Sequence, residues 1–244
     1  MSSLVKQVVI FCGGLGSRLG DLTKQIPKPI IPVAGKPYLE WQIESLRAHG
    51  LTDFKLLTGY LAEQIEDYFG DGRRWQVKIS YSREPKPLGT TAALKRAEPG
   101  LCQRFLLMNG DTFFPMDYTQ FLRKADAEAD KVWLVAVPAR VLGSDTRRGN
   151  TALDEASGRV TEYVRGGRDD LDFVHAGMFA LDRSWLAQMQ GEEGVSVESA
   201  LCPSLIERDL LRAFVVRERF YDMGTPKQLR ELDEFLTSYR RKLK

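Results

Sequence analysis

Histidine and cysteine are scarce in this 244-residue chain: there are two histidines and three cysteines. The cysteines, Cys12, Cys102 and Cys202, lie far apart, without a Cys-x-x-Cys spacing or a nearby pair of histidines. Neither a zinc site nor a disulfide framework can be read from this pattern. Cys12 and Cys102 are therefore expected to pack as small apolar residues in a reducing compartment.

Net charge and long apolar runs are also lacking. The formal net charge is +2, which gives no broad basic field, so nucleic acid is not favoured as a partner. No apolar run approaches the length of a membrane span, and the first residues lack the apolar segment of a signal peptide. These absences predict a cytoplasmic protein without a membrane partner. They leave open whether the chain forms a homo-oligomer.

Apolar runs alternate with amphipathic segments through the first part of the chain. This alternation predicts an α/β fold, with a Rossmann-like, mostly parallel central sheet that carries helices on both faces. Strands are expected at 7–12, 54–58, 77–82, 105–108 and 132–137, and helices at 38–49, 62–69, 90–97 and 118–127.

The pattern changes from about residue 151. Apolar segments at 159–164, 173–181 and 211–216 read as strands with fewer helices between them, consistent with a small antiparallel extension. An amphipathic helix is expected over 227–242. The sequence contains neither a repeat nor a low-complexity linker, so we expect one domain over residues 1–244.

The first motif with chemical content follows the first expected strand. Glycines at three of four successive positions give way to an arginine and to a lysine between two prolines. The residues are Gly13, Gly14, Gly16, Ser17, Arg18 and Lys28. A loop without Cβ atoms lets backbone N–H groups approach phosphates, and the two cations supply fixed positive charge. The loop is neither a Walker A motif, since no Gly-Lys-Ser/Thr follows, nor a dinucleotide fingerprint, since Leu19 stands at the third glycine position.

Two acids lie within apolar surroundings. Asp111 follows the strand expected at 105–108, and Asp222 lies between Tyr221 and Met223. A buried carboxylate needs a partner, and Mg²⁺ shared with nucleotide phosphates is a suitable one. Alternatively, each acid belongs to a turn or helix cap, because Thr225 and Pro226 after Asp222 resemble the start of a helix.

Four motifs together resemble the sugar-1-phosphate nucleotidyltransferase family. They are Gly-Gly-x-Gly-x-Arg-Leu with Pro-Lys-Pro, the Pro-Leu-Gly-Thr segment at 87–90, Asn-Gly-Asp-Thr at 109–112, and Asp-Met-Gly-Thr-Pro at 222–226. They occur in the family's order and cover nearly the whole chain. Within the family, segments 59–72 and 109–114 resemble the D-glycero-D-manno-heptose 1-phosphate guanylyltransferase branch.

The resemblance implies a GT-A-like fold with a nucleotide-binding half at about 1–138, a sugar-phosphate-binding half at about 139–224 and a C-terminal helix at 226–244. It also implies attack by a sugar-1-phosphate oxygen on the α-phosphorus of a nucleoside triphosphate, which expels pyrophosphate. Asp111 and Asp222 would bind Mg²⁺, Arg18 would hold the leaving phosphates, and Lys28 would bridge the α-phosphate and the incoming phosphate. Nucleotide contacts fall on Gly13, Gly14, Gly16, Ser17, Glu84, Gly89, Thr90, Asn109 and Gly110.

The acceptor side departs from the family pattern. Where Glu-Lys and Asn-Ala-Gly are usual, this chain has Arg165-Gly166 and His175-Ala176-Gly177. Arg165, Arg168 or Arg148 could supply the missing charge, or could be solvated loop residues. The acceptor contacts are assigned to Gly149, Glu162, Arg165, His175 and Gly177. We therefore expect glucose 1-phosphate to be a poor acceptor and a heptose 1-phosphate to be a better one.

The base is predicted from Glu84, in a segment that meets the base's Watson–Crick edge in the family. An ionised acid can accept from N1 and N2 of guanine, which favours GTP. CTP, UTP or dTTP remain alternatives, and so does a surface ion pair of Glu84 with Arg83 or Lys86. A non-catalytic nucleotide-sugar-binding subunit is the alternative of another class, but the residues it would be expected to lose are all present.

Overall fold

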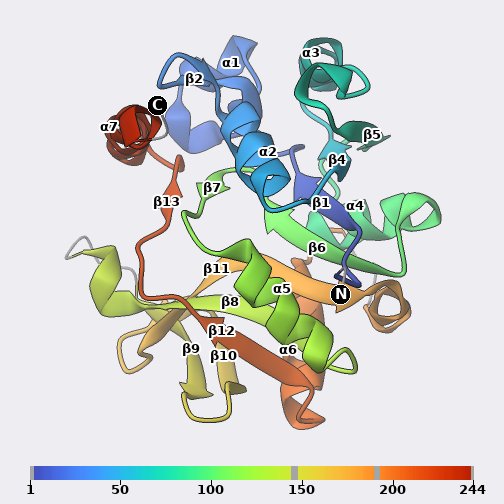
Figure 1. The fold of residues 1–244 in the computed structure, drawn as a ribbon, viewed down its shortest axis with the longest axis vertical. Coiled ribbons are helices and arrows are strands. Elements are labelled where there is room, and N and C mark those ends of the chain that lie inside the picture. Colours follow the sequence, from blue (N-terminus) through green and yellow to red (C-terminus); the bar gives the residue numbers. More distant parts are fainter. Residues whose placement is uncertain (1–2, 144–147, 190–192, 243–244) are drawn as a thin grey trace.

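A nine-stranded sheet forms the centre of the computed structural model, which describes residues 3–143, 148–189 and 193–242 (Figure 1). The strand order is β5-β4-β1-β6-β11-β8-β12-β10-β9. The strands are β1 Gln7–Phe11, β4 Asp53–Thr58, β5 Lys78–Arg83, β6 Arg104–Asn109, β8 Val132–Pro138, β9 Gly149–Asp154, β10 Arg159–Arg168, β11 Phe173–Asp182 and β12 Leu211–Val215.

The sheet is mixed, as expected. Strands β5, β4, β1 and β6 run parallel, and β11 is antiparallel to both β6 and β8. One detail of the prediction is wrong: β12 does not simply extend an antiparallel region, because it pairs in parallel with β8 and antiparallel with β10. Between β8 and β12 the chain passes through β9, β10, β11 and α6, and β12 enters the sheet antiparallel to β11 and therefore parallel to β8.

Helices cover both faces of the sheet. Side chains of α2 (Tyr38–Ala48), α3 (Ala62–Phe69) and α5 (Tyr118–Ala127) pack into the core of one face. Those of α4 (Thr90–Ala97) and α6 (Val197–Glu207) pack into the core of the other. This layering keeps the carboxyl ends of β1, β4 and β6 available for a ligand.

Helix α6 was not predicted. Its sequence is apolar on most sides and contains Pro203, so it lacks the polar stripe on which helix prediction depends. The available signal was its start, since Ser196 caps the helix and accepts a hydrogen bond from the Ser199 N–H at 3.2 Å.

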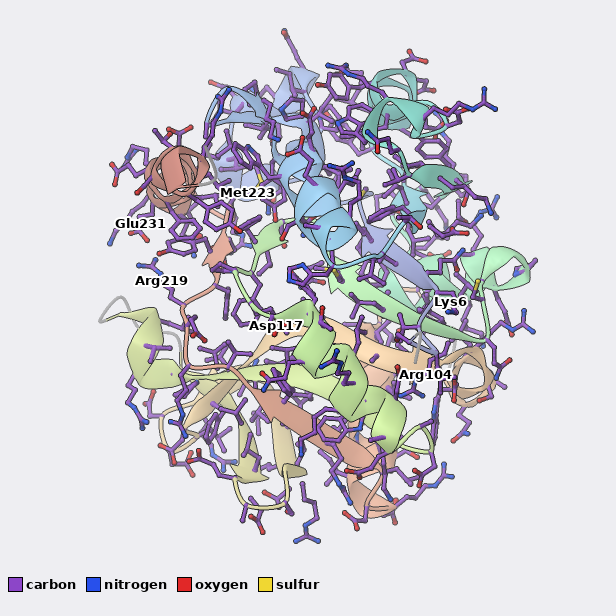
Figure 2. All side chains as sticks on the ribbon, in the orientation of Figure 1. Lys6, Arg104, Asp117, Arg219, Met223 and Glu231 are labelled. Atoms are coloured by element: carbon purple, nitrogen blue, oxygen red, sulfur yellow. The ribbon has the colours of Figure 1, made fainter. Side chains whose placement is uncertain are left out.

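The C-terminal helix α7 (Pro226–Lys242) returns to the N-terminal part of the chain (Figure 1). It lies beside the hairpin of β2 (Pro32–Val33) and β3 (Lys36–Pro37), and Leu232 and Leu236 are fully buried there. Figure 2 shows Arg219 and Glu231, which form an ion pair, and the fully buried Met223. The short strand β13 (Tyr221–Asp222) is thereby held in place before α7 begins.

Short 3-10 helices complete the described part of the chain: η1 Ser17–Leu19, η2 Lys28–Ile30, η3 Arg73–Trp75, η4 Glu98–Gly100, η5 Ala139–Leu142 and η6 Arg183–Gln188, with the four-residue helix α1 at Leu22–Gln25. All three thiols are free. Cys12 and Cys202 are buried, whereas Cys102 is partly exposed. Within residues 3–143, 148–189 and 193–242, no helix has both the length and the apolar character needed to cross a membrane.

Candidate active site

A cavity of about 510 Å³ opens at the carboxyl ends of β1 and β6. Parts of all four sequence motifs line it, although they are spread over two hundred residues of sequence. The lining residues are Phe11, Cys12, Gly14, Leu15, Gly16, Ser17, Arg18, Lys28, Pro29, Pro87, Thr90, Asn109, Gly110, Asp111 and Gly224. This convergence at the carboxyl edge of a parallel sheet is the usual place for a ligand in such folds.

Lys28 and Asp111 form an ion pair inside this cavity. The Lys28 Nζ lies 2.5 Å from the Asp111 Oδ2, and the two side chains are 10% and 33% exposed. Lys28 begins η2, and Pro27 and Pro29 fix the backbone on either side of it. The ion pair offsets the desolvation cost of the two charges, because either charge would be costly to bury alone.

Asp222 is brought next to Asp111 by strand pairing. β13 is antiparallel to β7 (Thr112–Phe113), with Asp222 opposite Thr112. The Met223 N–H also donates to the backbone carbonyl of Asp111 at 3.1 Å. The second predicted acid therefore lies on the strand beside the first.

Arg18 lies against the turn that follows Asp222. A Cβ atom placed on Gly224 would come within 3.1 Å of the Arg18 Nη2 atom. Glycine at 224 thus leaves room for the guanidinium, which lines the cavity together with Lys28. Arg18, Lys28 and Asp111 thus line the cavity, whereas Asp222 lines a separate small hollow with Arg219 and Lys227.

The donor set suits a metal ion that is shared with a bound polyphosphate. Asp111 and Asp222 offer hard carboxylate oxygens, and the described residues contain no cluster of three or more His, Cys, Asp or Glu side chains able to hold a metal by themselves. Mg²⁺ usually takes one or two protein carboxylates and completes its shell with phosphate and water oxygens. The residues present fit that arrangement.

A smaller pocket of about 200 Å³ adjoins the glycine-rich loop. Its lining is mainly apolar, with one acid: Phe11, Gly13, Gly14, Leu15, Leu57, Glu84, Pro87, Gly89, Thr90 and Ala93. Mainly apolar walls with few polar groups suit a base.

Glu84 is anchored in this pocket by its backbone surroundings. Its Oε2 accepts a hydrogen bond from the Leu88 N–H at 3.1 Å, and a Cβ on Gly13 would come within 2.6 Å of its Oε1. Burial raises the pKa of Glu84 above its usual value, and the Leu88 hydrogen bond opposes that rise. The surface ion pair considered as an alternative is not formed, because Arg83 pairs with Glu63 and Lys86 with Glu193.

A third hollow, of about 610 Å³, lies over β9, β10 and β11. It is lined by Arg148, Asn150, Gly166, Gly167, Asp169, Val174 and His175. Among the predicted acceptor residues only His175 lines it. Gly149, Glu162, Arg165 and Gly177 lie on the same three strands but outside the lining.

Asn150 was missed by sequence reasoning. Its Oδ1 accepts a hydrogen bond from the His175 N–H at 2.8 Å, which joins β9 to β11 at the hollow. Its only signal in the sequence was its place beside Gly149, because the contact with His175 depends on how β9 and β11 meet.

His175 supports the site and is not a cation. Its ring is buried, and its Nε2 lies 3.2 Å from both the N and the O of the Met178 backbone, within an irregularity of β11. Burial lowers the pKa of His175, and the nearby charge of Glu198 opposes that shift. The imidazole is therefore mostly neutral near pH 7.

Two of the three candidate arginines are already paired. Arg168 binds both carboxylate oxygens of Glu162, and Arg148 binds Asp169 at 3.0 Å. In contrast, Arg165 belongs to none of the ion pairs found in the described part of the chain, and it is exposed. Arg165 is thus the unpaired one among these three arginines, although it does not line the third hollow.

Close packing explains the two glycines assigned to the acceptor. A Cβ on Gly149 would lie 1.7 Å from the carbonyl oxygen of Leu171. Gly177 has a φ of +69°, and a Cβ there would lie 2.1 Å from the Asn109 Nδ2 atom. Gly177 therefore lets β11 pass close to the end of β6, where Asn109 lines the main cavity.

Comparison with known proteins agrees with this geometry. The family model for nucleotidyl transferases matches residues 7–239. The chain is 31% identical over 220 residues to a D-glycero-α-D-manno-heptose 1-phosphate guanylyltransferase of Campylobacter jejuni, covering 90% of this chain and 95% of that protein. It is 36% identical over 179 residues to an N-acetylmuramate α-1-phosphate uridylyltransferase of Neisseria meningitidis, covering 71% and 74%.

A solved structure shares the fold. The crystal structure of HddC from Yersinia pseudotuberculosis, complexed with GMP-PN, superimposes with a TM-score of 0.80 at 27% identity, covering 95% of this chain and all of that one. The four converging motifs, the mixed sheet and the match over nearly the whole length lead to one conclusion. The chain belongs to the nucleotidyl transferase family and is a sugar-1-phosphate nucleotidyltransferase.

Proposed function

We propose that the chain transfers a guanylyl group from GTP to a heptose 1-phosphate, giving the GDP-sugar and pyrophosphate. Guanine is supported chiefly by one observation, the half-buried carboxylate of Glu84 in the apolar pocket beside the glycine-rich loop. The Campylobacter relative is a D-glycero-α-D-manno-heptose 1-phosphate guanylyltransferase, which supports the same choice of both substrates.

Glu84 is suited to guanine because only one of its oxygens is engaged. The Leu88 N–H occupies Oε2, and Oε1 has no hydrogen bond among the described residues. Guanine offers two adjacent donors, whereas uracil and thymine offer one donor between two acceptors. A charge-assisted hydrogen bond in a desolvated pocket contributes about 1.5–3 kcal/mol, enough for roughly 10- to 150-fold discrimination.

The cavity residues would promote the reaction by holding charge in place. Arg18 would bind the departing β- and γ-phosphates, and Lys28 would stand by the α-phosphate where negative charge builds up. Asp111 and Asp222 would hold Mg²⁺, which supplies charge neutralisation to the polyphosphate when bound. The family uses its side chains to align an in-line attack, so no covalent protein intermediate is required.

A crossed substrate screen tests the base and the acceptor together. Pyrophosphate release is measured for GTP, CTP, UTP, dTTP and ATP, each with heptose, mannose, glucose and N-acetylmuramate 1-phosphates. We expect GTP with heptose 1-phosphate to give the highest kcat/KM, and glucose 1-phosphate to be poor. Another triphosphate used as well as GTP would overturn the guanine assignment, and equal use of glucose 1-phosphate would overturn the acceptor assignment.

The variant Glu84→Gln ties the base preference to its residue. We expect its GTP selectivity over the best other triphosphate to fall about 10-fold or more, because a neutral amide cannot accept the charge-assisted hydrogen bond that the carboxylate accepts. Glu63→Gln is the matched control, since Glu63 is exposed and pairs only with Arg83. Unchanged selectivity for GTP in Glu84→Gln would show that residues other than Glu84 recognise the base.

A further inference from the structure

The segment 193–197 is bound to the nucleotide side of the site by its backbone. The Gly194 N–H donates to the Leu88 carbonyl at 2.9 Å, and the Thr91 N–H donates to the Val195 carbonyl at 3.2 Å. The Val197 N–H donates to the Thr90 Oγ1 at 3.0 Å. The start of α6 is therefore fixed against the loop whose residue Thr90 lines both the cavity and the pocket for the base.

Glu198 follows directly on the sheet-facing side of α6. The buried residues of this helix are Val197, Leu201, Cys202 and Leu205. Glu198 lies three and four positions before Leu201 and Cys202, so it belongs to the same face, one turn nearer the cavity. A carboxylate at the cavity end of an otherwise apolar face has no role in the packing of that face.

Tyr163 on β10 and His175 on β11 lie on the sheet beneath this end of the helix. Their rings meet edge to face at 6.3 Å, and α6 packs against β10. The negative charge of Glu198 acts on both rings, where it adds to the burial that raises the pKa of Tyr163 and opposes the burial that lowers the pKa of His175. Glu198 itself lines neither hollow, but it follows directly after Val197, which is hydrogen-bonded to Thr90 of the main cavity, and its charge acts on His175 of the third hollow.

We propose that Glu198 is a specificity-determining residue that accepts a hydrogen bond from a hydroxyl of the acceptor sugar. The inference rests on the proposed function, in which the acceptor is a sugar 1-phosphate. A carboxylate accepts hydrogen bonds from hydroxyl groups and repels the negative charge of a phosphate. Glu198 would therefore recognise the sugar hydroxyls of the acceptor and not its phosphate. It is also placed so that the nucleotide loop, through segment 193–197, sets its position.

A purely structural role for Glu198 makes different predictions. A carboxylate in the first turn of a helix stabilises the helix by its interaction with the positive end of the helix dipole, but the Ser196 side chain already caps α6. If stability were the only role, a neutral residue would lower the melting temperature and leave the acceptor KM unchanged.

The test compares Glu198→Gln with Glu207→Gln, an exposed acid at the other end of α6. In the screen's best substrate pair, Glu198→Gln should raise the acceptor KM about 10- to 100-fold and leave the KM for the triphosphate within about twofold. Glu207→Gln should behave as wild type. Acceptors that each lack one hydroxyl identify the hydroxyl that Glu198 binds. For the wild type, one of these monodeoxy acceptors should be as poor a substrate as the parent sugar is for Glu198→Gln. The variant should use that monodeoxy acceptor and the parent sugar equally well.

An unchanged acceptor KM in Glu198→Gln would overturn the inference, and so would an equal loss on every deoxy acceptor. If the wild type turned over no pair in the screen, the proposed function would fail. Calorimetry would then still decide the role of Glu198 by measuring the binding of mannose and heptose 1-phosphates to both variants. Weaker binding to Glu198→Gln alone would support the proposed contact with the sugar, and equal binding to both variants would refute it.

Discussion

At the scale of single residues, the ion pair between Lys28 and Asp111 is the most informative contact. A nearly buried lysine is held 2.5 Å from an acid that is itself expected to bind a metal. The pair keeps both groups oriented before substrate arrives. Such preorganisation is what electrostatic catalysis requires, because no charge then has to move into place as the bond to pyrophosphate breaks.

Replacing Lys28 by alanine should reduce kcat by about 100-fold or more and raise the KM for the triphosphate much less. The reason is that its charge is worth most in the transition state. Steady-state kinetics measures the split, with Lys24→Ala as control, because Lys24 is exposed and pairs only with Asp21. A melting curve checks the fold, since the change leaves Asp111 without its partner. A variant altered only in KM would make Lys28 a ground-state binder.

At the scale of elements, the site depends on how closely β11 approaches β6. The irregularity between His175 and Phe179 lets Gly177 turn at positive φ against the Asn109 side chain. Asn109 in turn ends β6, and its backbone carbonyl accepts from the Gln42 side chain on α2 at 3.0 Å. A local deviation from regular strand geometry thus positions a residue of the main cavity.

The variant Gly177→Ala should lower both stability and activity, and Gly50→Ala at the end of α2 separates the two causes. Both glycines have positive φ, but nothing lies within 4 Å of a Cβ at Gly50. The backbone strain is about 1–2 kcal/mol in each case, so the two melting temperatures should both fall. Only Gly177→Ala should also reduce kcat/KM for the triphosphate, because it displaces Asn109. Equal kinetics in the two variants would contradict this account.

At the scale of the whole molecule, the ends of the chain complete the site. Gly224 reaches the cavity, and Asp222 lies beside Asp111, only because β13 pairs with β7 and α7 packs on the N-terminal hairpin. The cluster that holds α7 also contains Leu19, which follows directly after Arg18. The two predicted metal ligands are therefore adjacent only in the completed fold.

Asp111→Asn and Asp222→Asn should each keep the fold and reduce turnover by orders of magnitude, because each removes a charge that holds Mg²⁺ against the phosphates. Chelation with EDTA should abolish wild-type activity, and added Mg²⁺ should restore it. Calorimetry with and without Mg²⁺ should show that the metal's contribution to GTP affinity is lost in both variants. Asp130→Asn is the control, as Asp130 is exposed. Full activity of either variant in excess EDTA would end the metal assignment.

Much of the fold was readable from local pattern. The strands at β1, β4, β6 and β8 and the helices α2 to α5 all coincide with apolar periodicity within a few residues. Helix α6 was missed because it is apolar on most sides, and the parallel pairing of β12 with β8 was missed because strand direction depends on the connection and not on the strand.

The sequence alone determined the family, the glycine-rich loop and the residue types of the main cavity, because each of these lies in a short contiguous motif whose chemistry is local. Only the tertiary structure decided which arginine remains unpaired on β10, that His175 is buried and mostly neutral, that Asn150 accepts its backbone N–H, and that the charge of Glu198 acts on it. Those facts depend on burial and on contacts between β9, β10, β11 and α6, which no single stretch of sequence specifies.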